Sequence, residues 1–229
     1  SGSAHAAETG NLWSKHALVK AHSFKSALVQ KHILDIKSLR LSMRNQRRAL
    51  TEAQQHESAT KLSENLIALI SQQHVSRIGV YLANDGEIDP VEFVKWADSQ
   101  GIQSCLPVIS DTHGHMKFAE LTTHSVLKPN HFGIPEPQVA PGQLFKATQL
   151  DVILMPLVAF DFEGNRIGMG GGFYDQTLAF KRQHPYHQSP DLIGLAHAFQ
   201  QIEGIQPEDW DVPLDGIATE QRAWHFKAE

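Results

Sequence analysis

A cluster of glycines in the second half of the chain combines the features of a phosphate-binding loop. The apolar run 152–159 leads to Arg166 and then to Gly170, Gly171 and Gly172. Glycine has no Cβ, so the backbone can approach an oxyanion closely and can take positive φ angles. A strand that enters such a turn and then a helix presents backbone N–H groups to phosphate. The residues alone leave two alternatives, a phosphate or nucleotide site and a flexible turn at a strand end.

Two charged side chains flank this loop. Arg166 carries a planar fork of donors that suits phosphate, and Asp175 could hold a divalent cation between phosphates. The loop is not a Walker A motif, because no Gly-Lys-Ser/Thr follows the glycines, and no G-x-G-x-x-G opens the N-terminal half.

Positive charge gathers on one predicted helix near the start of the chain. Lys37, Arg40, Arg44 and Arg48 are three or four residues apart, so they share one helix face. Like charges at this spacing repel one another, and an anionic ligand would offset that repulsion. A solvated basic face is the alternative interpretation.

An acidic segment follows the predicted strand 77–82. Its residue Glu87 could accept hydrogen bonds from the amino groups of a heterocycle, although acidic residues are also common at helix N-termini. Another polar residue, His197, follows a later predicted strand and could face the same crevice.

Composition limits the class of protein. The chain has 229 residues, of which 41% are hydrophobic, which is enough for one sizeable core. No run of apolar residues is long enough to predict a membrane span. The net charge of −5 argues against a general nucleic-acid binder. The single cysteine, Cys105, allows neither an intrachain disulfide nor a cysteine metal cage, and cytoplasm is the expected compartment.

The periodicity of apolar residues predicts alternating helices and strands. Four helices are expected: one at 31–50, one that starts after a capping box formed by Thr51 and Gln54, one that starts at Pro90, and one at 173–181. Strands are expected at 77–82, 103–109, 116–121, 152–158, 192–196 and 216–219, and the segment 122–150 is expected to be rich in loops. This order predicts an α/β fold, a mostly parallel sheet with helices on both faces in a Rossmann-like three-layer sandwich. Such sheets bind ligands at the carboxyl ends of their strands, so Glu87 and the glycines could share one crevice. Residues 1–30 are expected to be an extension and 31–229 a single domain.

Five segments in the same order resemble one enzyme family. PLVAFDFEGNRIGMGGGFYD (156–175) closely resembles the signature of the 5-formyltetrahydrofolate cyclo-ligases, in its bacterial form. KSLRLSMRNQRRALTEAQ (37–54), IGVYLANDGEIDP (78–90), FGIPEP (132–137) and EDWDVPLDGIATE (208–220) are similar to further segments of that family. The resemblance covers the chain from about residue 36 to its end.

The resemblance implies roles for particular residues. It implies that ATP is bound by Lys37, Arg40, Arg44, Arg166, Gly168, Met169, Gly170, Gly171, Gly172, Phe173 and Tyr174. It implies that the folate is bound by Leu82, Glu87, Phe132, Met169, Gly170, Gly171, Gly172 and Phe173. Asp175 is expected to bind Mg²⁺, and Arg166 and Tyr174 are expected to be catalytic. The chain departs from the family at Ile36, where the family has a lysine, and the neighbouring Lys37 is the expected substitute.

The implied activity is an ATP- and Mg²⁺-dependent cyclisation of 5-formyltetrahydrofolate to 5,10-methenyltetrahydrofolate, with release of ADP and phosphate. The expected partners are small molecules alone, without nucleic acid or membrane, and the expected state is a monomer. Two rival hypotheses are a sugar-phosphate isomerase of similar build and a non-catalytic sensor of a phosphorylated metabolite. The basic helix and the glycine loop together favour the ligase.

Overall fold

The computed structural model describes residues 35–109, 114–183 and 189–226. A helix covers residues 35–49, in agreement with the helix predicted at 31–50. The internal contacts divide the chain after Ser42, so residues 35–42 are described separately from Met43 onward. The predicted boundary after residue 30 lies outside the described residues and remains a prediction.

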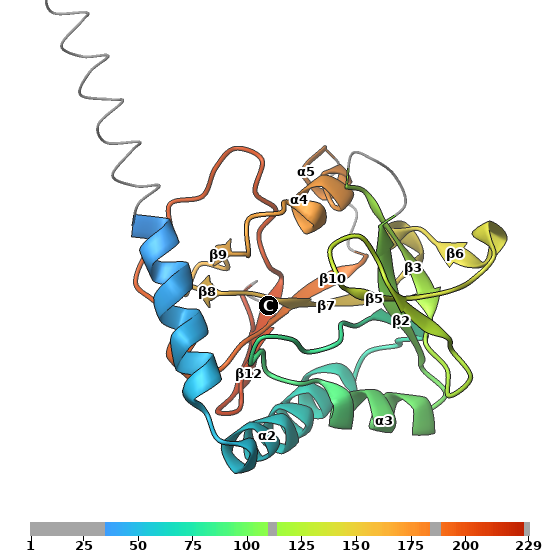
Figure 1. Cartoon of the computed structure of the whole chain (residues 1–229), viewed down its shortest axis with the longest axis horizontal. Helices are drawn as coiled ribbons and strands as arrows, with labels where there is room; N and C mark the ends of the chain where they lie inside the picture. The colour runs from blue at the N-terminus through green and yellow to red at the C-terminus, as the bar shows by residue number, and fades with distance from the viewer. Residues whose placement is uncertain (1–34, 110–113, 184–188, 227–229) are drawn as a thin grey trace, which may run out of the picture. The chain divides into compact units, whose positions relative to one another are not determined.

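The main sheet has eight strands in the order β12-β11-β10-β7-β1-β2-β3-β6 (Figure 1). Its strands are β1 (Arg77–Gly79), β2 (Gln103–Ile109), β3 (Met116–Glu120), β6 (Leu144–Phe145), β7 (Val152–Pro156), β10 (Asp191–Leu195), β11 (Gly216–Ala218) and β12 (Ala223–His225). The five central strands, from β11 to β2, pair in parallel, whereas the pairs at both edges are antiparallel. The predicted mostly parallel sheet is therefore confirmed.

Alternate residues of the central strand β7 pack in two separate hydrophobic cores, as expected of a strand buried on both faces. Val152 and Leu154 pack in one core with α2 (Glu52–Ile70) and α3 (Val91–Ser99). Ile153 and Met155 pack in the other, which includes Leu178 between α4 (Phe173–Thr177) and α5 (Phe180–Gln183). Figure 1 shows α2 and α3 on one side of the sheet and α4 and α5 on the other, so helices cover both faces.

The start of α2 forms as its sequence predicts. The Thr51 hydroxyl accepts a hydrogen bond from the backbone N–H of Gln54 at 3.3 Å, and the Gln54 side chain accepts one from the Thr51 backbone N–H at 2.9 Å. This reciprocal capping box satisfies donors that a helix start leaves without partners. It fixes the point at which the N-terminal helix ends and α2 begins.

The prediction of one helix at 173–181 is wrong. Leu178 is fully buried, and its φ of −100° and ψ of 6° end α4. A separate short helix, α5, starts at Phe180. The cost of leaving Leu178 outside the core would exceed the gain from one more helical hydrogen bond.

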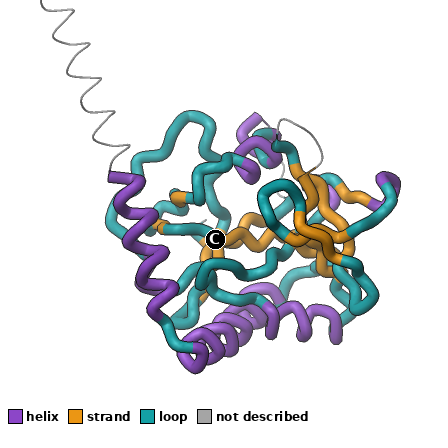
Figure 2. The backbone as a smooth tube through the Cα atoms, viewed as in Figure 1, coloured by secondary structure: helices purple, strands orange, loops and turns teal. Residues whose placement is uncertain are grey.

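Several short strands lie in segments that the sequence left as loops. They are β4 (Leu127–Pro129), β5 (Pro135–Pro137), β8 (Ala159–Phe160) and β9 (Arg166–Ile167), and single 3₁₀ turns occur at η1 (Pro141–Gln143), η2 (Ala147–Gln149) and η3 (Ala198–Gln200). Figure 2 shows how much of the backbone between the helices is loop. Among the described helices, none is both long and apolar enough to cross a membrane.

Candidate functional site

The carboxyl ends of two neighbouring strands define the site. β1 and β7 pair in parallel, with Ile78 opposite Val152. β1 leads into the loop that carries Glu87, and β7 leads into the hairpin β8–β9 and then the glycine loop. The Glu87 carboxylate contributes to the raised pKa of Tyr174, which follows the glycines. The predicted convergence of the two segments at one sheet edge is therefore present.

A tight turn presents Glu87. The backbone N–H of Glu87 donates to the carbonyl oxygen of Asn84 at 3.0 Å. Both central residues, Asp85 and Gly86, have positive φ angles, 56° and 73°, which is the signature of a type I′ turn. The Glu87 carboxylate closes the turn by accepting from the backbone N–H of Asn84 at 3.1 Å.

Burial controls the ionisation of the groups around Glu87. Desolvation raises the pKa of Glu87, while the hydrogen bond from Asn84 and the charge of Arg47 act in the opposite direction. Burial also raises the pKa of the Tyr81 and Tyr174 hydroxyls, and the Glu87 carboxylate adds to both shifts. The two phenols are therefore neutral hydrogen-bonding groups at neutral pH.

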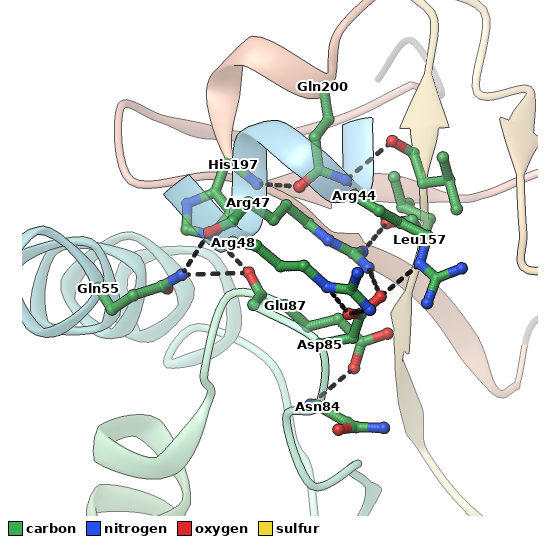
Figure 3. Close-up of polar contacts among 12 residues, drawn as sticks. Arg44, Arg47, Arg48, Gln55, Asn84, Asp85, Glu87, Leu157, His197 and Gln200 are labelled. Atoms are coloured by element: carbon green, nitrogen blue, oxygen red, sulfur yellow. Dashed lines mark hydrogen bonds and ion pairs between the residues drawn. The ribbon is translucent and has the colours of Figure 1, made fainter. Parts of the chain in front are cut away.

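Three arginines from the end of the N-terminal helix converge on one carboxylate (Figure 3). Arg44 lies 2.5 Å from Asp85 Oδ2 and Arg47 lies 3.3 Å from the same oxygen, while Arg48 pairs with Oδ1. Burial alone would raise the pKa of Asp85, but the hydrogen bonds and charges of Arg44 and Arg48 outweigh it and lower the pKa. The cluster keeps a net positive charge beside the turn.

Two further side chains hold the carbonyl oxygen of Gly86. Gln55 donates to this oxygen at 3.3 Å, and His197 Nε2 lies 3.2 Å from it (Figure 3). Burial lowers the pKa of His197, so its imidazole is neutral and Nε2 acts as the donor. The His197 ring stacks on Phe199, with the ring planes 6° apart. His197 thus supports the turn rather than facing an open crevice.

The glycine loop offers backbone donors. Gly170 and Gly172 have φ angles of 101° and 66°, which suit glycine alone. Among the described residues, no group accepts a hydrogen bond from the backbone N–H groups of residues 169–172. The Met169 side chain is 50% exposed. A loop with several unused N–H groups and positive φ angles can bind an anion such as phosphate.

Two aromatic side chains from distant segments meet beside this loop. The rings of Phe132 and Phe173 are 5.4 Å apart in an edge-on arrangement, and Phe132 is 56% exposed. Leu82, also predicted to touch the substrate, is 39% exposed. Phe132 thus offers accessible apolar surface beside the glycine loop, and Leu82 is accessible as well.

The two predicted charged residues of the loop bind each other. Arg166 Nη2 lies 2.7 Å from Asp175 Oδ1, and Arg166 Nη1 donates to the carbonyl oxygen of Val212. The Val212 backbone N–H donates to the same Asp175 oxygen at 3.1 Å. Arg166 also lines a cavity of about 200 Å³ together with Asp211. Its guanidinium is thereby oriented by two partners, and three of its five donors remain for a ligand.

Asp175 can hold a metal only with outside ligands. The described part of the chain contains no group of three metal-ligating side chains. The second carboxylate oxygen of Asp175 has no hydrogen-bond partner among the described residues. Magnesium is commonly bound by one or two carboxylates together with substrate phosphates and water. The residues therefore fit a magnesium ion that enters with a phosphorylated ligand.

Lys37 and Arg40 lie on the N-terminal helix. They belong to the part of the chain before Met43 and are described apart from the site. Their predicted contact with phosphate remains a prediction. The buried Lys181 Nζ pairs with Asp215 at 2.7 Å.

Sequence reasoning missed one buried anchor of the site. The Asp161 carboxylate accepts from the backbone N–H groups of Glu163, Asn165 and Ile205, each at 2.9 Å. These bonds shape the turn between β8 and β9 and hence aim Arg166. The spacing of Asp161, Gly164 and Asn165 is a turn signal that could have revealed it.

Comparison with known proteins agrees with this geometry. A model of the 5-formyltetrahydrofolate cyclo-ligase family matches residues 34–220. The 5-formyltetrahydrofolate cyclo-ligase of Haemophilus influenzae is 37% identical over 180 residues, covering 78% of this chain and 94% of that protein. The Escherichia coli protein of the same name is 34% identical over 185 residues, covering 80% of this chain and 100% of that protein.

Solved structures share the fold. The 5,10-methenyltetrahydrofolate synthetase of Aquifex aeolicus has a TM-score of 0.71 and 25% identity, covering 85% of this chain and 94% of its own. A protein of that name from Mycoplasma pneumoniae has a TM-score of 0.64, covering 81% of this chain and 99% of its own. Family model, sequence relatives and fold agree that this chain is a ligase that belongs to the 5-formyltetrahydrofolate cyclo-ligase family.

Proposed function

We propose that this chain uses ATP and Mg²⁺ to cyclise 5-formyltetrahydrofolate to 5,10-methenyltetrahydrofolate, with release of ADP and phosphate. The observation that carries the proposal is the glycine loop, whose N–H groups at residues 169–172 have no partner among the described residues. This loop adjoins Arg166 on the same sheet edge as Glu87. Hydrogen-bond donors for a phosphate and a carboxylate for a heterocycle are thus present on the same sheet edge.

The chemistry explains why ATP is required. The formyl oxygen attacks the γ-phosphorus of ATP, the bond from phosphorus to the ADP oxygen breaks, and the N5–formyl group becomes an imino phosphate. N10 then attacks the formyl carbon and loses its proton, and phosphate leaves with the former formyl oxygen. An oxygen of an amide-like formyl group is a poor leaving group until it is phosphorylated. The reaction needs no nucleophile from the protein.

The protein contributes position and charge in this proposal. Arg166, oriented by Asp175 and Val212, would neutralise charge on the transferred phosphoryl group together with the loop N–H groups. Lys37, Arg40 and Arg44 would contact the triphosphate. The Tyr174 hydroxyl, neutral because burial raises its pKa, would donate a hydrogen bond to the reacting oxygens.

The folate would lie across the accessible apolar surface. Glu87 would accept hydrogen bonds from the pterin amino groups, and Leu82 and Phe132 would cover its faces. Asp175 would hold Mg²⁺ that enters with ATP, which supplies positive charge between the phosphates when bound. Holding both substrates in reactive contact replaces a collision between two molecules in solution.

The test is the appearance of the methenyl chromophore when purified protein is mixed with 5-formyltetrahydrofolate, ATP and Mg²⁺. The proposal predicts product only when all three are present, and none when each is omitted in turn. Binding of the folate without turnover would contradict the proposal and favour a sensor. Turnover of a sugar phosphate without ATP would contradict it in favour of an isomerase.

A further inference from the structure

The carboxylate of Asp85 lies outside the groups proposed to bind ATP and folate, and three arginines bind it. It is one of the two central residues of the turn that presents Glu87, and its φ of 56° is the only positive value of a non-glycine residue in the described part of the chain. A non-glycine residue in this region costs about 1 kcal/mol. Such a conformation persists only where the surroundings impose it, and at Asp85 the surroundings are three arginines.

One of the three arginines, Arg47, is buried. The Arg47 side chain is 1% exposed, and its Nε has no hydrogen-bond partner among the described residues. Its terminal nitrogens reach Asp85 Oδ2 at 3.3 Å and the carbonyl oxygen of Leu157 at 3.5 Å. Asp85 is therefore the counter-ion of a buried charge, and this charge lies between the β7 end and the turn.

Gly86, the second central residue of the turn, is fixed as well. Gly86 has no room for a Cβ, which would lie 2.8 Å from the Arg47 backbone. Its carbonyl oxygen is held by Gln55 and His197. With Asp85 held by the arginines, the turn has little freedom, and Glu87 leaves it in one direction.

We propose that Asp85 is a positioning residue for the folate, because its three-arginine clamp fixes the type I′ turn that aims the Glu87 carboxylate at the pterin. This inference rests on the proposed function, in which Glu87 contacts the folate. Asp85 itself touches neither substrate. Arg44 belongs both to this clamp and to the groups proposed for the triphosphate. The loss of Asp85 leaves Arg44 available to ATP and should therefore not weaken ATP binding.

The test is a double-mutant cycle of Asp85→Asn and Glu87→Gln, with KM for 5-formyltetrahydrofolate and for ATP measured separately. Asparagine keeps the shape and tolerates positive φ, so this change removes the charge alone. We expect Asp85→Asn to raise the folate KM about tenfold and not to raise the ATP KM. In the Glu87→Gln background the same change should have almost no further effect. Asp98→Asn, on the exposed end of α3, removes an equal charge and serves as the matched control.

Two results would overturn the inference. One is an Asp85→Asn effect of the same size in both backgrounds, and the other is an equal rise of both KM values. Failure of the proposed function is distinguishable, because then the wild type gives no turnover or Glu87→Gln alone leaves the folate KM unchanged.

Asp85→Asn leaves the buried Arg47 without its counter-ion and can prevent folding. Arg48→Met then replaces it in the cycle, since Arg48 is 54% exposed and holds Asp85 Oδ1. A rise in folate KM that vanishes in the Glu87→Gln background supports the clamp. An unchanged folate KM, or a rise that persists with glutamine at position 87, would overturn it.

Discussion

At the scale of single residues, Arg166 and Asp175 depend on each other. The Arg166 side chain is 7% exposed, and its guanidinium is held by Asp175 and the Val212 carbonyl. The sequence marked both residues as ligands of a triphosphate and its metal, and it gave no sign that they pair. The pair explains how Arg166 keeps a fixed orientation beside the glycine loop.

We predict that Arg166→Ala lowers kcat/KM for ATP by about 10²- to 10³-fold, the usual effect of losing one fixed donor to developing charge. Steady-state kinetics with varied ATP measure this effect. Arg182→Ala is the control, because Arg182 is an exposed arginine whose side chain donates to the Asp209 carbonyl oxygen at 3.0 Å. Unchanged ATP kinetics in Arg166→Ala would remove this residue from the site.

A second residue-scale prediction concerns Glu87, whose pKa burial raises above 4.5. The folded state holds this proton more tightly than the unfolded state, so Glu87 costs stability as pH rises from about 4.5 through its folded pKa. Glu87→Gln should therefore raise the free energy of unfolding at pH 7 and lose this advantage below about pH 4.5. Urea unfolding of both proteins across this range measures the difference.

The same variant should lose activity. A hydrogen bond to a charged group contributes about 1.5–3 kcal/mol, so kcat/KM for the folate should fall about ten- to hundredfold. A variant that is both more stable and less active has the pattern of a functional residue kept at a cost to stability. Lower stability at pH 7 would show instead that Glu87 is a structural carboxylate.

At the scale of elements, the glycine loop is shaped by contacts as well as by backbone freedom. A Cβ at Gly171 would lie 2.7 Å from the Phe173 ring, which itself touches Phe132. We predict that Gly171→Ala displaces Phe173 and lowers kcat/KM about a hundredfold, since a displacement of about 1 Å in a site can have this effect. Gly142→Ala, where nothing lies within 4 Å of the added Cβ, is the matched control. Equal activity of the two variants would contradict this account of the loop.

The stability that His197 gives to the turn at residues 84–87 should depend on pH. Burial lowers the pKa of His197 below 6.5, so protons bind the unfolded state more readily as pH falls below this value. The stability that neutral His197 gives is complete above about pH 6.5 and is lost as pH falls through the window between 6.5 and its folded pKa. Denaturant unfolding at several pH values should show this loss in the wild type and a smaller one in His197→Gln. His124→Gln, at an exposed site, should keep the wild-type slope.

Local patterns predicted those elements whose causes are local. The strand β2 begins and ends where predicted, and the Thr51 capping box forms. Both depend on the types of residues that are neighbours in the sequence. The β1 strand is shorter than predicted because the chain leaves the sheet toward the turn at Asp85. The break at Leu178 and the short strands β8 and β9 depend on burial and pairing with distant segments, which one sequence does not display.

At the scale of the whole molecule, the family resemblance predicted the site residues, and their roles remain predictions. The segments that carry Glu87 and Tyr174 leave the sheet at the same edge because β1 and β7 are parallel neighbours, a consequence of the predicted topology. The clamp of Asp85 by three arginines required the folded structure, since the pairs span 37 to 41 positions of sequence. Action as a monomer on small molecules alone remains a prediction.

We predict that removal of residues 1–30 leaves kcat/KM within about twofold of the full chain, because the family match begins at residue 34. The truncated and full-length proteins are compared in the same chromophore assay. A collapse of activity together with a lower melting temperature would make the extension part of the fold.

The most direct test of the central claim follows the formyl oxygen. 5-Formyltetrahydrofolate with a heavy oxygen isotope in the formyl group is converted with unlabelled ATP, and the released phosphate is analysed by mass spectrometry. If the site brings the formyl oxygen against the γ-phosphate, the label appears in phosphate in step with methenyl formation. Label that appears in water, with unlabelled phosphate released, would contradict the account.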